Sequence, residues 1–490
     1  MVQWKLKGYL MIPERQGSEV VHEREEGWFI FVENREAVLA TLKEGQCDGI
    51  LPAARGFLDG FAEFCLRAGV LTAFESFPDR RARRTIPMFF FCNTLVYRPL
   101  WRLPRLQPIQ RTLFRSPYIL RQLGFNARQI DVGFYQTAAG KKPFTAQAIA
   151  DAFVRSRAED FLVNQQAVLG ALWNYCAGQF RSALWAMDSV HFRVPRGAHT
   201  PERAFKACVL GVWQDSVVWP MLWMLVSPDE AEVTVGRKLV AAAEAVIGAG
   251  AIRHLLVDRG YLDGAWLNEL HDRGTRVTMG VREDMLILED MINLSRLPNM
   301  VWEAAEPPQI HDEPTPQREI MGLAGMEVEW DACDVPLSSC LIRDTYPEQV
   351  RYRGLVTTEP AIPACDILRD DRQRWTLEEV FMTLTRYWHF DDLPPCRLGV
   401  AYAMTHFALQ AYTLLGFYLQ ETDTALDIQT WNMAPPPLPL PERELAVYAG
   451  PYFALLRPSE LIAIILEHMD AWQAHREQLI MALRLTEGNT

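Results

Sequence analysis

Three consecutive segments decide the fold: LWAMDSVHFRV at residues 184–194, FKACVLGVW at residues 205–213 and SVVWPMLWMLV at residues 216–226. Side chains alternate between the two faces of a strand, and these segments have that period. Their short connections predict an antiparallel meander with Asp188 in the middle of its first strand. Pro220 indicates an edge or a bulge in the third strand, because proline cannot donate a ladder hydrogen bond.

The residues after this meander alternate between helix and strand signals. Ser227-Pro228-Asp229-Glu230 predicts a helix start with a capping box, and the helix would run to about Gly248. IRHLLVD then predicts a strand that ends at Asp258, Asp263 caps a helix that stops near Gly274, and TRVTMGVR predicts a fifth strand. The order β-β-β-α-β-α-β predicts an α/β fold: an RNase H-like catalytic core with a mixed five-stranded sheet.

The second half of the chain continues this core after an interruption. Residues 283–353 have weak, proline-rich signals and predict a β-rich insertion. A long helix is expected from Ala364 to Trp388. The apolar stretch from Val400 to Leu419 contains Thr405, His406, Gln410 and Thr413 and has no basic cluster at its ends, so we expect a buried core helix rather than a membrane span. APPPLPLP at 434–441 predicts a stiff spacer, and an amphipathic helix follows from Ser459 to about Leu485.

The N-terminal part carries a basic block inside an acidic protein. The chain has 490 residues, 49% of them apolar and 22% charged, and a formal charge of −12. Between Arg80 and Lys142, however, there are thirteen arginines and lysines and one acid, Asp131. We expect residues 1–175 to form a mostly helical domain with a long helix over Thr145–Tyr175. Its basic face would contact DNA, with Arg80, Arg81, Arg83 and Arg84 as candidates.

Composition and motifs set the remaining boundaries. Nine cysteines without a C-x-x-C pair indicate free thiols in a reducing compartment. No signal peptide is apparent, which predicts a cytoplasmic protein. The expected domains are a helical, partly basic DNA-binding domain (1–175), a catalytic domain (176–425) and a spacer with a C-terminal helix (426–490).

Three carboxylates fall where the predicted sheet would bring them together. Asp188 lies within the first strand, Asp258 ends the neighbouring fourth strand, and Glu378 is on the helix that crosses the sheet. Carboxylates placed close together need cations, and oxygen ligands suit Mg²⁺. Two such ions, for which Mn²⁺ can substitute, would clamp the attacking and leaving oxygens of a phosphoryl transfer. The residues therefore predict phosphodiester chemistry.

The segments around these acids resemble a known family. AMDSVHF, LLVDRGYLDGAWLNEL and LVTTEPAIPACDILRDDRQRWTLEEVF are similar to the three catalytic motifs of bacterial insertion-sequence DDE transposases. The closest likeness is to the class with a Tyr-Arg-Glu-Lys signature and a β-rich insertion before the glutamate. Asp-x-Gly-Tyr at 258–261 fits the second motif and Arg-Trp-x-Leu-Glu-x-x-Phe at 374–381 fits the third. The resemblance covers about half of the chain. It implies that Asp188, Asp258 and Glu378 bind metal and that Arg374 contacts DNA.

Two positions depart from that signature. Asp371 stands in place of the tyrosine and Thr385 in place of the lysine. Both share a helix face with Arg374 and Glu378, and Arg386 lies about 100° away around the helix. Arg386 is an imperfect replacement for the missing cation, and Trp213 is a candidate for stacking on an unpaired base.

The sequence-based reading is a DNA transposase that cuts and joins element ends. Its expected partners are double-stranded DNA with terminal inverted repeats, target DNA and a second copy of the chain, and its expected place is the bacterial nucleoid. Two alternatives remain open. One is a catalytically inactive or domesticated DNA-binding protein with the same fold, to which Asp371 and Thr385 point. The other is an RNase H-fold nuclease without strand transfer.

Overall fold

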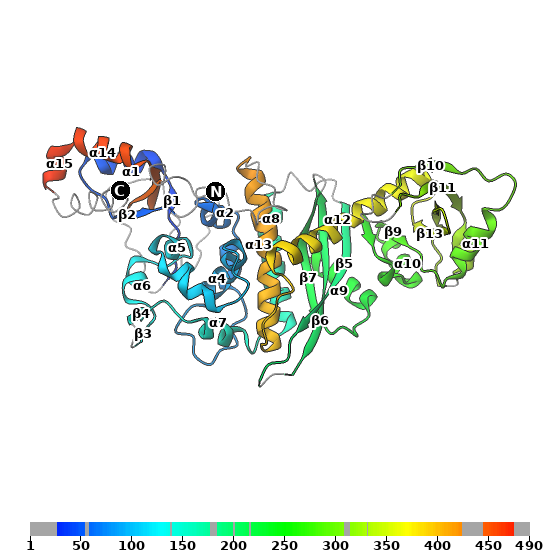
Figure 1. Ribbon diagram of the computed structural model, residues 1–490, viewed down its shortest axis with the longest axis horizontal. Coiled ribbons are helices and arrows are strands. Elements are labelled where there is room, and N and C mark those ends of the chain that lie inside the picture. The colour runs from blue at the N-terminus through cyan, green and yellow to red at the C-terminus, as the bar shows by residue number, and fades with distance from the viewer. Residues whose placement is uncertain are drawn as a thin grey trace. The chain divides into compact units, whose positions relative to one another are not determined.

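The computed structural model describes residues 27–53, 58–137, 140–176, 184–198, 201–214, 217–307, 314–330, 332–423 and 444–474. Its contacts divide the chain into two compact units. The first unit combines Met1–Ser156 with Leu414–Thr490, and the second is Arg157–Thr413. Figure 1 colours the chain from blue at the N-terminus to red at the C-terminus. Each unit is described separately below.

The second unit is built on one mixed sheet of nine strands in the order β10-β11-β12-β13-β9-β8-β5-β6-β7. The strands are β5 (Leu184–Val194), β6 (Arg203–Gln214), β7 (Val217–Val226), β8 (His254–Val257), β9 (Arg276–Gly280), β10 (Glu303–Ala305), β11 (Gln317–Ala324), β12 (Ser338–Thr345) and β13 (Val350–Thr357). The predicted meander is confirmed, because β6 pairs antiparallel with both β5 and β7. Strand β8 lies between β5 and β9 and pairs parallel with both.

Pro220 lies on an edge strand and at a bulge, as its position predicted. Leu210 pairs with Leu222 and Gly211 pairs with Pro220, so the register between β6 and β7 shifts there by one residue. A Cβ atom at Gly211 would lie 2.4 Å from the side chain of Val218. A residue without a side chain is therefore required opposite the bulge.

The predicted β-rich insertion extends this sheet. Strands β11, β12 and β13 form an antiparallel ladder, and β13 joins the core by pairing antiparallel with β9. Helix α11 (Leu286–Leu294) precedes them. The insertion is thus continuous with the sheet of the core.

Long helices accompany the sheet. They are α8 (Ala158–Tyr175), α9 (Glu232–Ile247), α10 (Gly264–Asp272), α12 (Ala364–Trp388) and α13 (Leu398–Glu421). The predicted limits of α12 are confirmed, and Asp263 caps α10 by accepting a hydrogen bond of 2.8 Å from the Trp266 backbone. In Figure 1 the yellow α12 crosses the strands of the sheet, and it contacts β5 and β8.

Two predicted helix limits are wrong. The capping box at Ser227–Glu230 does not start α9: Glu230 N donates to Ser227 O at 3.1 Å and closes a single turn, so the helix begins at Glu232. The helix expected over Thr145–Tyr175 is broken into α7 (Ala146–Phe153) and α8. The Asp160 carboxylate accepts a hydrogen bond of 2.8 Å from Arg157 N. This bond caps the N-terminus of α8, so a separate helix begins there instead of a continuation of α7.

The apolar helix α13 is a buried core helix, as predicted. Its polar side chains form hydrogen bonds with other elements of the second unit. His406 Nε2 lies 3.0 Å from Asn164 Oδ1, Gln410 donates to that same oxygen at 3.1 Å, and Thr413 donates to Pro220 O at 2.6 Å. Among the described residues, no helix is long and apolar enough to cross a membrane.

The first unit joins short helices to a small sheet that the sequence did not predict. Its sheet has the order β1-β15-β14-β2, formed by β1 (Val32–Glu33), β2 (Gly49–Pro52), β14 (Leu445–Ala449) and β15 (Tyr452–Leu456). Its other elements are α1 (Arg35–Lys43), α2 (Phe61–Arg67), α3 (Val70–Glu75), α4 (Met88–Leu100), α5 (Pro117–Gln122), α6 (Ala127–Val132), α7, the hairpin strands β3 (Tyr135–Thr137) and β4 (Gly140–Lys142), α14 (Pro458–Glu467) and α15 (Met469–Ala474). Val38 and Leu42 of α1 pack with Val447, Leu461 and Trp472 in one core.

The prediction of one continuous C-terminal helix from Ser459 to about Leu485 is wrong for the part that the structure describes. Helix α14 ends at Glu467, and a second short helix, α15, begins at Met469. His468 N bonds to Ile464 O at 3.1 Å and ends the first helix. The predicted spacer at 434–441 lies outside the described residues, as does the chain after residue 474.

Candidate functional site

The structure brings the three predicted acids together from three different elements. Asp188 lies within β5, and Asp258 follows directly after β8. Because β5 and β8 are parallel and Met187 pairs with Val257, the two aspartates occupy neighbouring positions on adjacent strands. Glu378 comes from α12, which packs on β5 and β8. The acids converge because a parallel strand pair and a crossing helix meet at this point.

The Arg374 guanidinium occupies the centre of this acidic cluster. Its Nη1 atom lies 2.9 Å from Glu378 Oε1, 3.2 Å from Asp188 Oδ2 and 3.9 Å from Asp258 Oδ1. Its Nε atom lies 3.7 Å from Asp371 Oδ1. One cation thus touches four carboxylates. The sequence-based reading placed Arg374 against DNA, whereas here it pairs with the acids themselves.

Burial dominates the titration behaviour of the cluster. Asp188 is 8% exposed, and burial raises its pKa to about 7, although Arg374 acts in the opposite direction. Burial also raises the pKa of Glu378, again against Arg374. For Arg374, burial lowers the pKa, but the surrounding carboxylates, led by Asp371, outweigh it and raise the pKa overall. The guanidinium is therefore a permanent positive charge inside the cluster.

The cluster opens into a cavity of about 390 Å³. Asp258, Asp371, Arg374 and Glu378 line it together with the exposed indole of Trp375. Two further cations, Arg259 and Arg353, reach the same cavity. A polyanion entering here would be attracted by the arginines, whereas the carboxylates would repel it unless cations lay between them.

The donor chemistry suits Mg²⁺, but in this structure the three carboxylates are arranged around the Arg374 guanidinium. No group of three or more His, Cys, Asp or Glu side chains in the described part of the chain is placed to hold a metal ion. The carboxylate oxygens gather at 2.9–3.9 Å from Arg374 Nη1, whereas Mg²⁺ binds oxygen at about 2.1 Å. In this arrangement the guanidinium takes the place of a metal.

Asp371 belongs to the cluster, and the sequence-based reading had not assigned it a role there. It is 9% exposed, and its second oxygen lies 3.9 Å from Arg353 Nη1. Its position one helical turn before Arg374 was the available signal. Thr385 and Arg386 are exposed further along α12, and the Arg386 guanidinium lies 5.5 Å from the ring centre of Tyr387.

Trp213 lies away from the acidic cluster. It pairs with Leu184 in the β5–β6 ladder, whereas Asp188 pairs with Val209, four register positions further along. Its indole Nε1 is buried and makes no hydrogen bond among the described atoms. The structure therefore does not place Trp213 beside the acids.

The predicted DNA-contacting arginines of the first unit differ in what they touch. Arg81 donates to both carboxylate oxygens of Asp79, at 2.7 and 2.8 Å, and to Ile86 O at 2.7 Å. Arg84 donates to Asp79 O at 2.8 Å, and its side chain stays 68% exposed. Arg80 and Arg83 are exposed. A cavity of about 490 Å³ is lined by Arg81, Arg83 and Arg155 over an apolar floor that includes Phe91.

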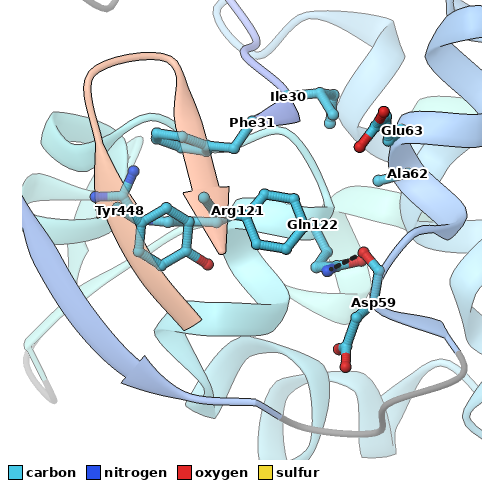
Figure 2. Close-up of a pocket in the computed structure, with 9 residues that line it drawn as sticks. Ile30, Phe31, Asp59, Ala62, Glu63, Arg121, Gln122 and Tyr448 are labelled. Atoms are coloured by element: carbon cyan, nitrogen blue, oxygen red, sulfur yellow. Dashed lines mark hydrogen bonds between the residues drawn. The ribbon is translucent and has the colours of Figure 1, made fainter. Parts of the chain in front are cut away.

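Another arginine of the basic block is held by aromatic rings. Figure 2 shows Arg121 beside Phe31 and Tyr448, and its guanidinium lies 4.7 and 4.9 Å from their ring centres. The cavity there has a volume of about 20 Å³, room for about one water molecule. Gln122 donates to Asp59 O at 2.9 Å beneath it. This feature packs α5 against β14 and is too small for an organic ligand.

Comparisons with known proteins give a distant structural likeness. No protein-family model and no curated protein matches the chain. Among solved structures, the chain is similar to the piggyBac transposase synaptic complex with hairpin DNA, with a TM-score of 0.38 and 10% sequence identity. The match covers 79% of this chain and 81% of that chain. The proposal below therefore rests on the arrangement of this chain's own side chains.

Proposed function

We propose that the chain is a DNA transposase of the DDE type, which cuts and joins element ends by phosphoryl transfer. The observation that carries this proposal is the convergence of Asp188, Asp258 and Glu378 from β5, the end of β8 and α12 around one guanidinium, beside a cavity that Asp258 and Glu378 line. The strand order β7-β6-β5-β8-β9, with β6 antiparallel to its neighbours, supports an RNase H-like core.

The proposed cofactor is Mg²⁺, bound as two ions, with Mn²⁺ as a substitute. Asp188, Asp258 and Glu378 supply the hard oxygen ligands that it prefers. When bound, such ions activate water and stabilise charge on the phosphoryl oxygens. Arg374 has to leave the centre of the cluster first, and its released guanidinium would then face the cavity, where a DNA phosphate is a suitable partner.

The proposed partners are double-stranded DNA with terminal inverted repeats, target DNA and a second copy of the chain. Exposed arginines of the first unit, Arg83 and Arg84 among them, are suited to hold the phosphate backbone. Membership of the bacterial insertion-sequence class is likewise a proposal. The chain has Asp371 and Thr385 where the signature of that class has tyrosine and lysine.

One competing function is favoured by a specific observation. Arg374 neutralises part of the negative charge of the cluster. Asp371 forms a further ion pair with the Arg374 guanidinium and helps to keep it in place. A DNA-binding protein that has lost turnover would keep such an arrangement. An RNase H-fold nuclease without strand transfer shares the acidic cluster, and it differs only in the products that it makes.

The deciding experiment uses duplexes that tile the genomic DNA on both sides of the coding region. The full chain is incubated with them in Mg²⁺ or Mn²⁺, and nicks and strand-transfer products are resolved on denaturing gels. A transposase nicks at the boundary of an inverted repeat and joins the freed 3′ end to a second duplex. Nicks without joining indicate the nuclease, and binding without nicks indicates the inactive protein.

A further inference from the structure

We propose that Glu232 is a positioning residue that fixes Asp188 and Asp258 relative to each other. The inference deepens the proposed function and rests on it, because it concerns the same acidic cluster. Glu232 is the first residue of α9. Its carboxylate contacts the segments that follow each of the two aspartates, so one side chain reaches both β5 and the turn after β8.

The first contact is made behind Asp188. Neighbouring side chains on a strand point to opposite faces, so Ser189 faces away from the acidic cluster. Its hydroxyl donates to Glu232 Oε1 at 2.5 Å, and its backbone N–H donates to Asp188 Oδ1 at 2.7 Å. Ser189 therefore links the carboxylate of Glu232 to the orientation of the Asp188 side chain.

The second contact is a buried ion pair with the next strand. Lys206 Nζ lies 3.6 Å from Glu232 Oε1, and the exposed fractions of the two side chains are 5% and 19%. Lys206 is on β6, where it pairs with His191 of β5. A buried ammonium needs a counter-charge, so Lys206 holds Glu232 at this place.

The third contact is made behind Asp258. A Cβ atom at Gly260 would lie 1.8 Å from Glu232 Oε2, far inside any contact distance. Gly260 is two residues after Asp258 in the turn Arg259–Tyr261. A side chain at this position would displace the flexible end of Glu232, so the glycine of the Asp-x-Gly-Tyr motif lets the carboxylate stay close against the turn.

These contacts make a specific claim about metal binding. If Glu232 sets the spacing of the two aspartates, then losing it weakens cation binding in the cluster without removing any ligand. Changes in groups that orient metal ligands typically cost about 10–100-fold in affinity. Gly260→Ala should act in the same direction as Glu232→Gln, because it pushes the same carboxylate away.

The test compares Glu232→Gln and Gly260→Ala with Glu244→Gln as a matched control. Glu244 is also buried on α9, pairs with Arg273 at 3.3 Å and accepts from Gly250 N at 3.0 Å, away from both aspartates. Tm, the Kd for Mn²⁺ by calorimetry and the rate of DNA nicking are measured for each. A fourth variant, Glu232→Gln with Lys206→Met, also removes the lysine charge that Glu232→Gln leaves without its partner. It distinguishes a loss of stability from a loss of metal affinity.

We expect Glu232→Gln and Glu244→Gln to lower Tm alike, and only the first to raise the Kd for Mn²⁺ by about tenfold. The double variant should recover Tm but not the affinity. Equal Mn²⁺ affinity in Glu232→Gln and Glu244→Gln, with an active wild type, overturns the inference alone. If the wild type neither binds Mn²⁺ nor nicks DNA, the proposed function fails and the inference fails with it.

Discussion

Arg374 Nη1 lies 3.2 Å from Asp188 Oδ2, and both side chains are buried at the centre of the candidate site. Asp188, Asp258, Asp371 and Glu378 surround this one guanidinium. The cluster keeps an excess of negative charge even with the arginine in place. A divalent cation and the Arg374 side chain therefore compete for the same oxygens.

Replacing Arg374 should strengthen metal binding in the absence of DNA. Arg374→Gln removes the competing charge, and we expect the Kd for Mn²⁺ to fall by about tenfold, about 1.4 kcal/mol. Calorimetric titration of the DNA-free protein measures it. Arg372→Gln is the control, because Arg372 is exposed on the same helix and pairs with Glu306. Unchanged or weaker Mn²⁺ binding in Arg374→Gln would show that the arginine does not block the cluster.

Neutralising a cluster acid should abolish DNA cleavage without unfolding the chain. We expect Asp258→Asn or Glu378→Gln to reduce nicking at least about 10³-fold, because each removes a charged oxygen ligand from the cluster. Glu379→Gln, at the exposed neighbour of Glu378, is the matched control and should nick like the wild type. Gel assays with the flanking-DNA duplexes measure the rates. Full activity in Glu378→Gln contradicts the assigned role.

Local patterns in the sequence sufficed for the part of the fold that carries the acids. The period-two alternation around Asp188 predicted β5, although the first five residues of that strand are all buried, and the apolar spacing of α12 predicted the helix, because one of its faces is buried. The small sheet of the first unit was not predictable in this way. Strand β1 pairs with β15 and β2 with β14, and no local pattern links segments about 400 residues apart.

The candidate site was predictable in membership but not in arrangement. Spacing on one helix face placed Arg374 and Glu378 together with Asp371. Whether a guanidinium points to DNA or back into the acids depends on rotamers and charge balance, which a motif does not encode. The roles of Ser189, Glu232 and Gly260 depend on contacts between β5, α9 and the turn after β8, so they became visible only in three dimensions.

The insertion should owe part of its stability to a buried ion pair. Arg318 donates to Asp344 through Nε and Nη2, both at 2.7 Å, and the side chains are 4% and 8% exposed. We expect Arg318→Met to cost about 3–5 kcal/mol, because it leaves a buried carboxylate without a partner. Hydrogen exchange of the β11 and β12 amides measures the loss.

The neighbouring pair in the same ladder supplies the control for that change. Arg343 and Glu319 pair directly opposite each other, next to the Arg318–Asp344 pair, and their side chains are 27% and 23% exposed. Arg343→Met should cost about 1 kcal/mol or less, since water screens the pair. Equal losses in the two variants would mean that burial does not decide the contribution of these pairs.

Acid should destabilise the second unit through His406. Its side chain is 0% exposed, and burial lowers its pKa from 6.5 to about 3. Trp223 Nε1 donates to Nδ1 at 3.2 Å, so the ring is neutral with its proton on Nε2, facing Asn164. Below pH 6.5 the unfolded chain binds a proton at His406, whereas the folded chain binds it only near pH 3. The free energy of unfolding therefore decreases as the pH is lowered from about 6.5 to about 3.

The change between pH 7 and pH 4.5 measures this contribution. Over that interval the wild type should lose about 2–3 kcal/mol more than His406→Asn, since the asparagine has no proton to bind. Urea unfolding followed by tryptophan fluorescence at both pH values measures the difference. His271→Asn, at an exposed histidine of the same unit, should lose as much as the wild type. If His406→Asn loses as much stability in acid as the wild type, protonation of the His406 imidazole is not the cause. Another group must then govern the loss of stability.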